Sequence, residues 1–409
     1  MQKGIFLKVK AKQNNRKKED FTPLSENCLK VKTKQNNRLT YIDYLETIAM
    51  FCVICCHYYA VMGKGVSANM YMLFVKCFGV PIFLLANGAL MFQKKFSLRK
   101  HLKKTGMLIV TTAAWKAVYL LIQYIRLPAG SCIWKISDLW DYFCGGNLSN
   151  PYVPAEHFWY MYALIGVYLV FPLFASIYEE KKTYYFYLIL LLFFTPIITE
   201  IDAFIANVTG KSISFSVIRG VYSPFALAGY YLLFFLLGPL LHQYFYKSEK
   251  KKKHRIIAVG TATVGAVLLV IEYYMQNGTL GGAYQALQGD YQRFATLLMT
   301  AGIYSLFATF DLKKTKINSI MEFISVRTIG IYAAHMMLAY LFSAWLVNKT
   351  SRIGVYMLVL QSLVVMLGSI IITEIFSMIP GLRTILGLNY YKMRKNYWKQ
   401  KRLQHKEGS

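Results

Sequence analysis

Ten apolar runs of about 18–25 residues alternate with short polar or basic segments along the middle of the chain. A run of this length crosses a hydrocarbon core of about 30 Å as an α-helix. Only helices and closed barrels satisfy every backbone hydrogen bond in lipid, and a barrel would show alternating segments of about ten residues instead. The pattern therefore predicts an all-α, polytopic membrane bundle, with spans near 41–63, 70–92, 105–125, 157–178, 184–201, 222–246, 255–275, 291–311, 325–347 and 355–378.

Polar ends divide the chain into three parts, with a membrane domain over 41–378 between a tail at 1–40 and a basic tail at 379–409. The first tail is too polar to bury a core, so we expect it to be disordered. It contains a short repeat, LKVKAKQNNR at Leu7–Arg16 and LKVKTKQNNR at Leu29–Arg38. The repeat is either a local duplication beside the membrane or a tether to anionic lipid. No cleavable signal peptide is visible.

Basic residues are distributed unevenly between the two sides of the predicted bundle. The formal net charge of +28 would by itself suggest nucleic acid as a partner. However, 37 of the 47 Lys and Arg residues fall in the segments on the side of the N-terminus, against about 8 on the other side. This bias follows the positive-inside rule and predicts that both termini are cytoplasmic. The charge therefore indicates the lipid bilayer as a partner and not nucleic acid. The basic inner loops at 99–104 and 247–255 either only anchor helices or also contact an anionic cytoplasmic ligand.

No soluble catalytic domain accompanies the spans, so any chemistry has to take place inside the membrane bundle. The sequence shows no zinc or iron–sulfur ligand pattern, and we expect no metal. Cys132 and Cys144 share one outer loop. Their spacing permits a disulfide in an oxidising exterior without requiring one.

Three ionisable residues lie in the first predicted span, where such groups are costly and usually functional. Glu46 and His57 are 11 residues apart, so a helix places them on one face, separated by three turns or roughly 16 Å. Asp43 lies one turn before Glu46. Asp43 is either part of this polar face or a solvated helix start that suits the helix dipole. His57 is either a reactive group or a hydrogen-bonded interior histidine.

The fourth span opens at its outer end with His157, Trp159 and Tyr160. If the first and fourth spans pack together, His157 lies at a level near His57. A neutral histidine can accept a hydroxyl proton near physiological pH. The aromatic pair is equally explained by an interfacial aromatic belt.

Three further polar residues occur within spans. Asn87 precedes Gly88 and follows Pro81, which predicts a helix irregularity that either lines a cavity or is a plain packing kink. Lys116 and His335 lie in the middle of their spans.

These residues together resemble the acyltransferase-3 family of integral membrane acyltransferases. The first span of that family reads roughly R-x-x-x-(I/L)-D-x-L-R-x-x-A, followed by apolar residues and a final His. The second-span pattern F-x-x-S-G-F is similar to Phe83–Ala89, with Asn87 in place of Ser. HFWYMYAL at 157–164, FALAGYYL at 225–232 and IGIYAAHMML at 329–338 resemble later family motifs, in order. The first-span matches are Arg38, Ile42, Asp43, Leu45, Ala49 and His57.

One position departs from the family pattern, because Glu46 occupies the place where the family commonly has an Arg. An Arg there could bind a phosphate or polarise an acyl carbonyl, and a Glu can do neither. Either another cation, such as Lys116 or Lys76, takes the place of this Arg, or the acyl donor differs from that of the family, or the activity is reduced.

The resemblance implies a bacterial plasma membrane O-acyltransferase. It implies acetyl-CoA or succinyl-CoA as the donor, with basic inner loops meeting the CoA phosphates. The acceptor would be a hydroxyl of a cell-surface polysaccharide or its lipid-linked precursor, beside glycan synthesis machinery. His57, Glu46 and Asp43 are assigned to the catalytic set. The substrate-binding set is His157, Trp159, Tyr160, Asn87, Lys116 and His335.

Two other functions compete with acyl transfer. A polysaccharide exporter or transporter should show internal repeats and paired broken helices, and no convincing repeat is visible among the spans. A membrane sensor or anchor would not need histidines within its spans.

Overall fold

The computed structural model describes residues 38–62, 71–126, 134–148, 153–209, 229–280, 286–287, 289–312, 315–346 and 354–388. Apart from Arg38, these residues belong to one compact unit, which begins at Leu39. The repeat in the first tail and Cys132 lie outside the described residues. The tether and the disulfide therefore stay predictions.

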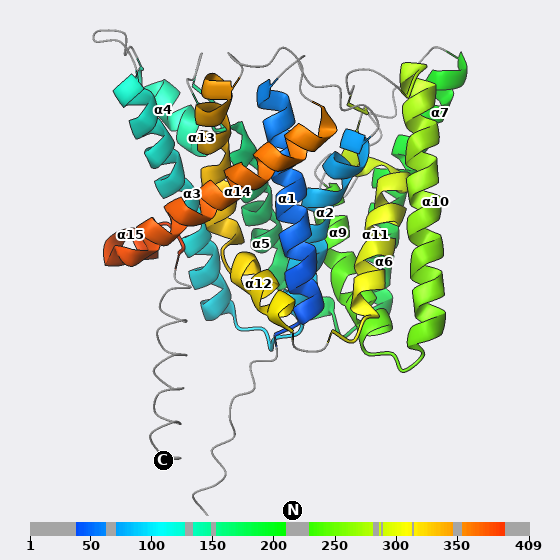
Figure 1. Ribbon diagram of the computed structural model, residues 1–409. Coiled ribbons are helices and arrows are strands. Elements are labelled where there is room, and N and C mark those ends of the chain that lie inside the picture. The colour runs from blue at the N-terminus through cyan, green and yellow to red at the C-terminus, as the bar shows by residue number, and fades with distance from the viewer. Residues whose placement is uncertain are drawn as a thin grey trace, which may run out of the picture. The chain divides into compact units, whose positions relative to one another are not determined.

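The described residues form helices joined by short connections, with no strand among them, so the predicted all-α class is confirmed (Figure 1). The short 3₁₀-helices are η2 (Glu156–Phe158) and η6 (Asp290–Gln292), and the short π-helices are η3 (Phe193–Ile197) and η5 (His242–Tyr246). The α-helices are α1 (Thr40–Met62), α2 (Tyr71–Phe92), α3 (Leu98–Arg126), α4 (Ile136–Cys144), α5 (Trp159–Ile177), α6 (Lys181–Leu192), α7 (Ile198–Thr209), α9 (Gly229–Leu241), α10 (Lys251–Asn277), α11 (Phe294–Ala308), α12 (Lys316–Ser325), α13 (Thr328–Leu346), α14 (Val355–Met378) and α15 (Pro380–Ile385).

Within the described ranges, seven helical segments are long and apolar enough to cross a membrane. The pair α12 and α13, bent by 70° at its junction, makes an eighth candidate. The sequence pattern predicts ten spans. The other two contain α9 of 13 residues and α11 of 15 residues, shorter than the roughly 20 residues of a straight span. The chain is a multi-pass membrane protein. We call the bundle end at Thr40 the inner end, in keeping with the predicted orientation, and the opposite end the outer end.

Helix α2 packs against α1 and α9 and is buried along most of its length. Gly88 of α2 lies against the Phe235 carbonyl of α9, and Gly238 of α9 lies against the Leu85 carbonyl of α2. A Cβ atom at either glycine would overlap that backbone. The predicted irregularity at Asn87 and Gly88 is therefore not a break in the helix. Gly88 is present because two backbones approach closely, as small residues allow in membrane bundles.

Helices α10 and α11 pack side by side in the same way (Figure 1). A Cβ atom at Gly265 would overlap the Met299 amide nitrogen, whereas Gly260 on the same helix faces open space. We expect Gly265→Ala to destabilise the protein by about 1–3 kcal/mol through overpacking. Gly260→Ala should stabilise it by up to about 1 kcal/mol through helix propensity. Thermal unfolding of both variants in detergent tests this, and equal midpoints would contradict the close packing.

Candidate active site

Three histidines from distant parts of the chain meet in the outer half of the bundle. His57 comes from α1, His157 from η2 just before α5, and His335 from α13. Nε2 of His335 lies 3.1 Å from Nδ1 of His57. The ring centroid of His157 lies 5.2 Å from that of His335 and 6.2 Å from that of His57. Of the predicted site residues, these three are brought into one cluster.

Hydrogen bonds to backbone carbonyls fix the tautomers of His57 and His335. Nδ1 of His57 donates to the Val53 carbonyl at 3.0 Å, and Nδ1 of His335 donates to the Tyr332 carbonyl at 2.5 Å. A carbonyl only accepts, so each neutral ring carries its proton on Nδ1. The Nδ1–H of His57 is then shared with the lone pair on Nε2 of His335. Nε2 of His57 keeps its own lone pair and makes no hydrogen bond within the described part of the chain. That nitrogen is placed to accept a proton.

His157 is 1% exposed and packs among the rings of Tyr119, Phe158 and Tyr332. Neither of its ring nitrogens has a hydrogen-bond partner of normal geometry among the described residues. The nearby Ala333 carbonyl already accepts the Tyr119 hydroxyl at 2.7 Å. An unsatisfied buried polar group costs about 1–3 kcal/mol. A bound polar ligand or a water molecule would remove this cost.

The two aromatic residues that follow His157 are packed inside the bundle. Tyr160 is 7% exposed, and its ring lies 5.7 Å from that of Tyr332. Trp159 is half-buried, with its ring 5.8 Å from that of Tyr231 and 6.1 Å from that of Tyr291. Tyr160 reaches the histidine cluster through Tyr332, whose ring lies 5.5 Å from that of His157, and Trp159 packs with Tyr231 and Tyr291. Contacts inside the bundle favour a binding wall over a lipid-facing aromatic belt.

The acidic residues of α1 lie toward its inner end. Asp43 is 4% exposed, so it is not the solvated helix start that the sequence left open. Glu46 is half-buried, and its carboxylate accepts the Ser325 hydroxyl at 2.5 Å, at the junction of α12 and α13. The residue in the place of the family Arg therefore ties α1 to this junction.

Arg327, which the sequence reading did not single out, lies at the same junction. It forms an ion pair with Glu374 of α14, and its Nε donates to that carboxylate at 2.6 Å. One guanidinium nitrogen also donates to the Phe323 carbonyl at 2.6 Å. Glu374 has 19% of its side chain exposed and is paired with Arg327.

A chain of hydrogen bonds connects the start of α3 to Asn87. Lys104 donates to the Tyr168 hydroxyl at 2.9 Å, and Tyr168 donates to Oδ1 of Asn87 at 3.0 Å. Asn87 in turn donates to the Phe83 carbonyl at 3.0 Å. Glu46 lies within electrostatic range of Tyr168. Sequence analysis missed Lys104 because the basic run RKHLKK at 99–104 has the composition of a solvated flank.

The ammonium groups of Lys116 and Lys76 have partners in the structure. Lys116 is 1% exposed and donates to the carbonyls of Tyr142 and Gly146, beside α4. Burial raises the pKa of the Tyr142 hydroxyl, so this group stays protonated and donates to the Lys116 carbonyl at 3.0 Å. Lys76 pairs with Asp290 of η6. Lys116 thus anchors the outer helix α4 to α3.

Among the described residues, no group of three or more His, Cys, Asp or Glu side chains is arranged to hold a metal ion.

Comparison with known proteins gives one match. A family model described as an acyltransferase domain matches residues 39–378, which include every residue of the site described above. No curated protein and no solved structure matches the chain.

Proposed function

Because the chain belongs to the acyltransferase-3 family, we propose that it transfers an acetyl or succinyl group from a cytoplasmic acyl-CoA to a sugar hydroxyl. The acceptor is a cell-surface polysaccharide or its lipid-linked precursor. The membrane is the plasma membrane of a bacterium. The termini lie in the cytoplasm, as the charge bias predicts.

The observation that carries this proposal is the free lone pair on Nε2 of His57. In the proposed step, the acceptor hydroxyl gives its proton to this nitrogen while its oxygen attacks the thioester carbonyl carbon. The carbon–sulfur bond breaks, and the proton passes from His57 to the leaving thiolate. In the alternative order, Nε2 attacks the thioester carbon and the carbon–sulfur bond breaks to release the CoA thiolate. The acceptor oxygen then attacks the acyl carbon, the bond to Nε2 breaks, and the acceptor proton passes to the thiolate. In both orders His335, as a positioning residue, accepts the Nδ1–H of His57 and orients its ring.

The acceptor sugar is proposed to lie beside His157, Trp159 and Tyr160 at the outer end. The two unpartnered ring nitrogens of His157 match the hydroxyl groups of a sugar, which both donate and accept. The packed rings of Trp159 and Tyr291 supply an aromatic surface next to them. Tyr160 has a buried hydroxyl without a hydrogen-bond partner of normal geometry among the described residues, which a sugar hydroxyl would satisfy.

The donor is proposed to enter from the inner end, along the polar face of α1. Lys104, at the start of α3, meets the CoA phosphates in place of the missing family Arg. The hydrogen-bonded chain from Lys104 to Asn87 lines this entry. The roughly 16 Å from Glu46 to His57 is then spanned by the pantetheine arm.

Lys104→Met should raise KM for acyl-CoA by about 10–100-fold while changing kcat little. The reason is that a hydrogen bond to a charged group contributes about 1.5–3 kcal/mol. Steady-state kinetics of the purified protein in lipid discs measure both constants. Lys103→Met, on an exposed neighbour, is the matched control and should change KM less than about 3-fold. A fall in kcat at unchanged KM would contradict the donor role.

The whole function is tested by supplying purified protein in liposomes with radiolabelled acetyl-CoA or succinyl-CoA and extracted surface glycan. In parallel, a host strain lacking the gene is compared with its complemented strain by mass spectrometry of surface glycans. We expect labelled ester groups on the glycan and their loss in the deletion strain. Unchanged acylation with reduced surface glycan would favour an exporter.

A further inference from the structure

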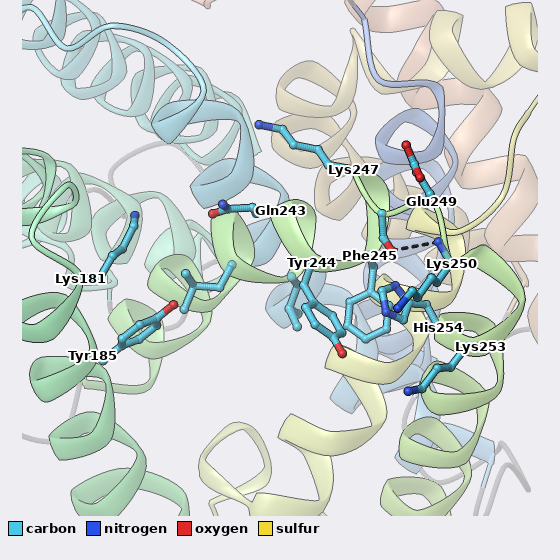
Figure 2. A pocket seen from close by; sticks show the side chains of 13 residues that line it. Lys181, Tyr185, Gln243, Tyr244, Phe245, Lys247, Glu249, Lys250, Lys253 and His254 are labelled. Atoms are coloured by element: carbon cyan, nitrogen blue, oxygen red, sulfur yellow. Dashed lines mark hydrogen bonds between the residues drawn. The ribbon is translucent and has the colours of Figure 1, made fainter.

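A cavity of about 1040 Å³ lies at the inner end, between α6, η5 and the start of α10 (Figure 2). Its volume matches the upper range of small-molecule sites. Four lysines and one histidine line it, with one acidic residue, Glu249, among them. The lysines are Lys181, Lys247, Lys250 and Lys253, and the histidine is His254. None of the four lysines forms an ion pair with a carboxylate within the described ranges.

Positive charge is concentrated at the N-terminal end of helix α10, where the helix dipole is positive as well. Helix α10 has 27 residues and begins at Lys251, with no side-chain hydrogen bond at its N-cap Lys250. The N-terminus of a helix carries partial positive charge and favours anions. Here Lys250 and Lys253 add positive charge to it, and only Glu249 offsets them locally. A bound anion would relieve this repulsion and accept from first-turn amides other than that of Lys251, which donates to the Glu249 carbonyl at 2.9 Å.

A buried imidazole provides a second, independent sign of a ligand. His254 lines the cavity and is 6% exposed, and its Nδ1 has no hydrogen-bond partner among the described residues. Its ring stacks on Tyr244 at 4.5 Å and meets Phe245 at 5.4 Å, which holds it in place (Figure 2). A buried polar atom without a partner calls for an explanation, and an unseen ligand is one.

The neighbouring surface is apolar and faces lipid. On α6, Phe186 and Ile189 are 57% and 62% exposed, and on α10 Ile256 is 67% exposed. A ligand with an anionic headgroup and hydrocarbon chains would fill the lysine-lined cavity and cover the apolar faces of α6 and α10. A soluble anion would leave the apolar faces unused.

We propose that this cavity binds the phosphate headgroup of an anionic phospholipid, with its acyl chains along α6 and α10. Anionic lipids of the cytoplasmic leaflet attract clustered basic residues, and basic pockets between helices bind their headgroups. The inference is independent of the acyl-transfer proposal, since the donor site is assigned to α3.

The test uses the full-length protein in detergent, titrated with phosphatidylglycerol, with phosphatidylcholine or with inorganic phosphate. Retained lipid is read by native mass spectrometry and the unfolding midpoint by thermal denaturation. We expect phosphatidylglycerol to raise the midpoint and to remain bound, because a ligand that binds only the folded state stabilises it. Equal protection by phosphatidylcholine or by inorganic phosphate would overturn the assignment to an anionic lipid.

Variants localise the site. Lys250→Gln/Lys253→Gln should weaken phosphatidylglycerol binding at least tenfold. Lys94→Gln/Lys95→Gln removes the same charge from exposed positions outside the cavity and should bind like the unaltered protein. All four lysines are exposed, so both variants are expected to fold, which gel filtration checks. Equal weakening in the two variants would show a non-specific charge effect and overturn the proposal.

Discussion

Replacing His57 with alanine is expected to lower acyl transfer by about 10²–10⁴-fold, which is the usual contribution of a general base. The change removes Nε2, the nitrogen placed to take the acceptor proton. It also removes the contact with His335 at 3.1 Å. Transfer is measured by the appearance of labelled ester on extracted glycan, with enzyme amount matched by gel filtration. Equal transfer by the variant and the unaltered protein would remove His57 from the mechanism.

His335→Gln is the comparison that separates the two roles. This variant keeps the lone pair on Nε2 of His57 and removes only the ring that orients it. We expect a smaller loss of transfer than in His57→Ala, together with an altered pH profile, because the Nδ1–H of His57 loses its imidazole acceptor and keeps only the Val53 carbonyl. An identical loss in both variants would mean that the two histidines act as one unit.

Arg327→Ala is expected to destabilise the protein by about 3–5 kcal/mol, the usual cost of breaking a buried ion pair. The change would leave the half-buried Glu374 without its cation and free the Phe323 carbonyl. Helices α12 and α13 meet at this point, so the contact of Ser325 with Glu46 should loosen as well. Thermal denaturation in detergent and transfer activity measure the two effects.

A double variant and a surface control complete this experiment. Arg327→Met/Glu374→Met removes both charges and should recover much of the stability, because neither buried charge is then left unpaired. Arg99→Ala, at an exposed position of α3, should change stability by less than about 0.5 kcal/mol. A loss at Arg99 as large as that at Arg327 would contradict the importance of the buried pair.

The parts of the site that follow from helix geometry and burial cost could be predicted from the sequence. Polar residues within apolar runs indicated His57, His157 and His335, since such residues are rarely tolerated without a role. The interval of 11 residues predicted that Glu46 and His57 lie on the same face of one helix. His157 does lie near His57, although α1 and α5 are not among the helix pairs that pack extensively in the described part of the chain.

The parts that depend on pairing between distant segments could not be predicted. Ser325 and Glu46 are 279 residues apart, and Arg327 and Glu374 are 47 apart. No local pattern specifies such partners. Helix α12 was predicted as part of an inner loop because the polar and basic composition of 312–327 does not fit a span, although it forms a helix bent by 70° from α13. The pair Asn87 and Gly88 suggested a helix irregularity, since a sequence does not show that another backbone lies against the glycine.

The glycine contacts limit how this protein can move. Gly88 and Gly238 bring the backbones of α2 and α9 together, and Gly265 does the same for α10 and α11. No side chain lies between the backbones at these points to act as a deformable spacer, so sliding or opening there would require backbone overlap or a large loss of packing. Each pair therefore behaves as a rigid body. A substrate that needs a wider passage to His57 must therefore obtain it by movement elsewhere in the bundle.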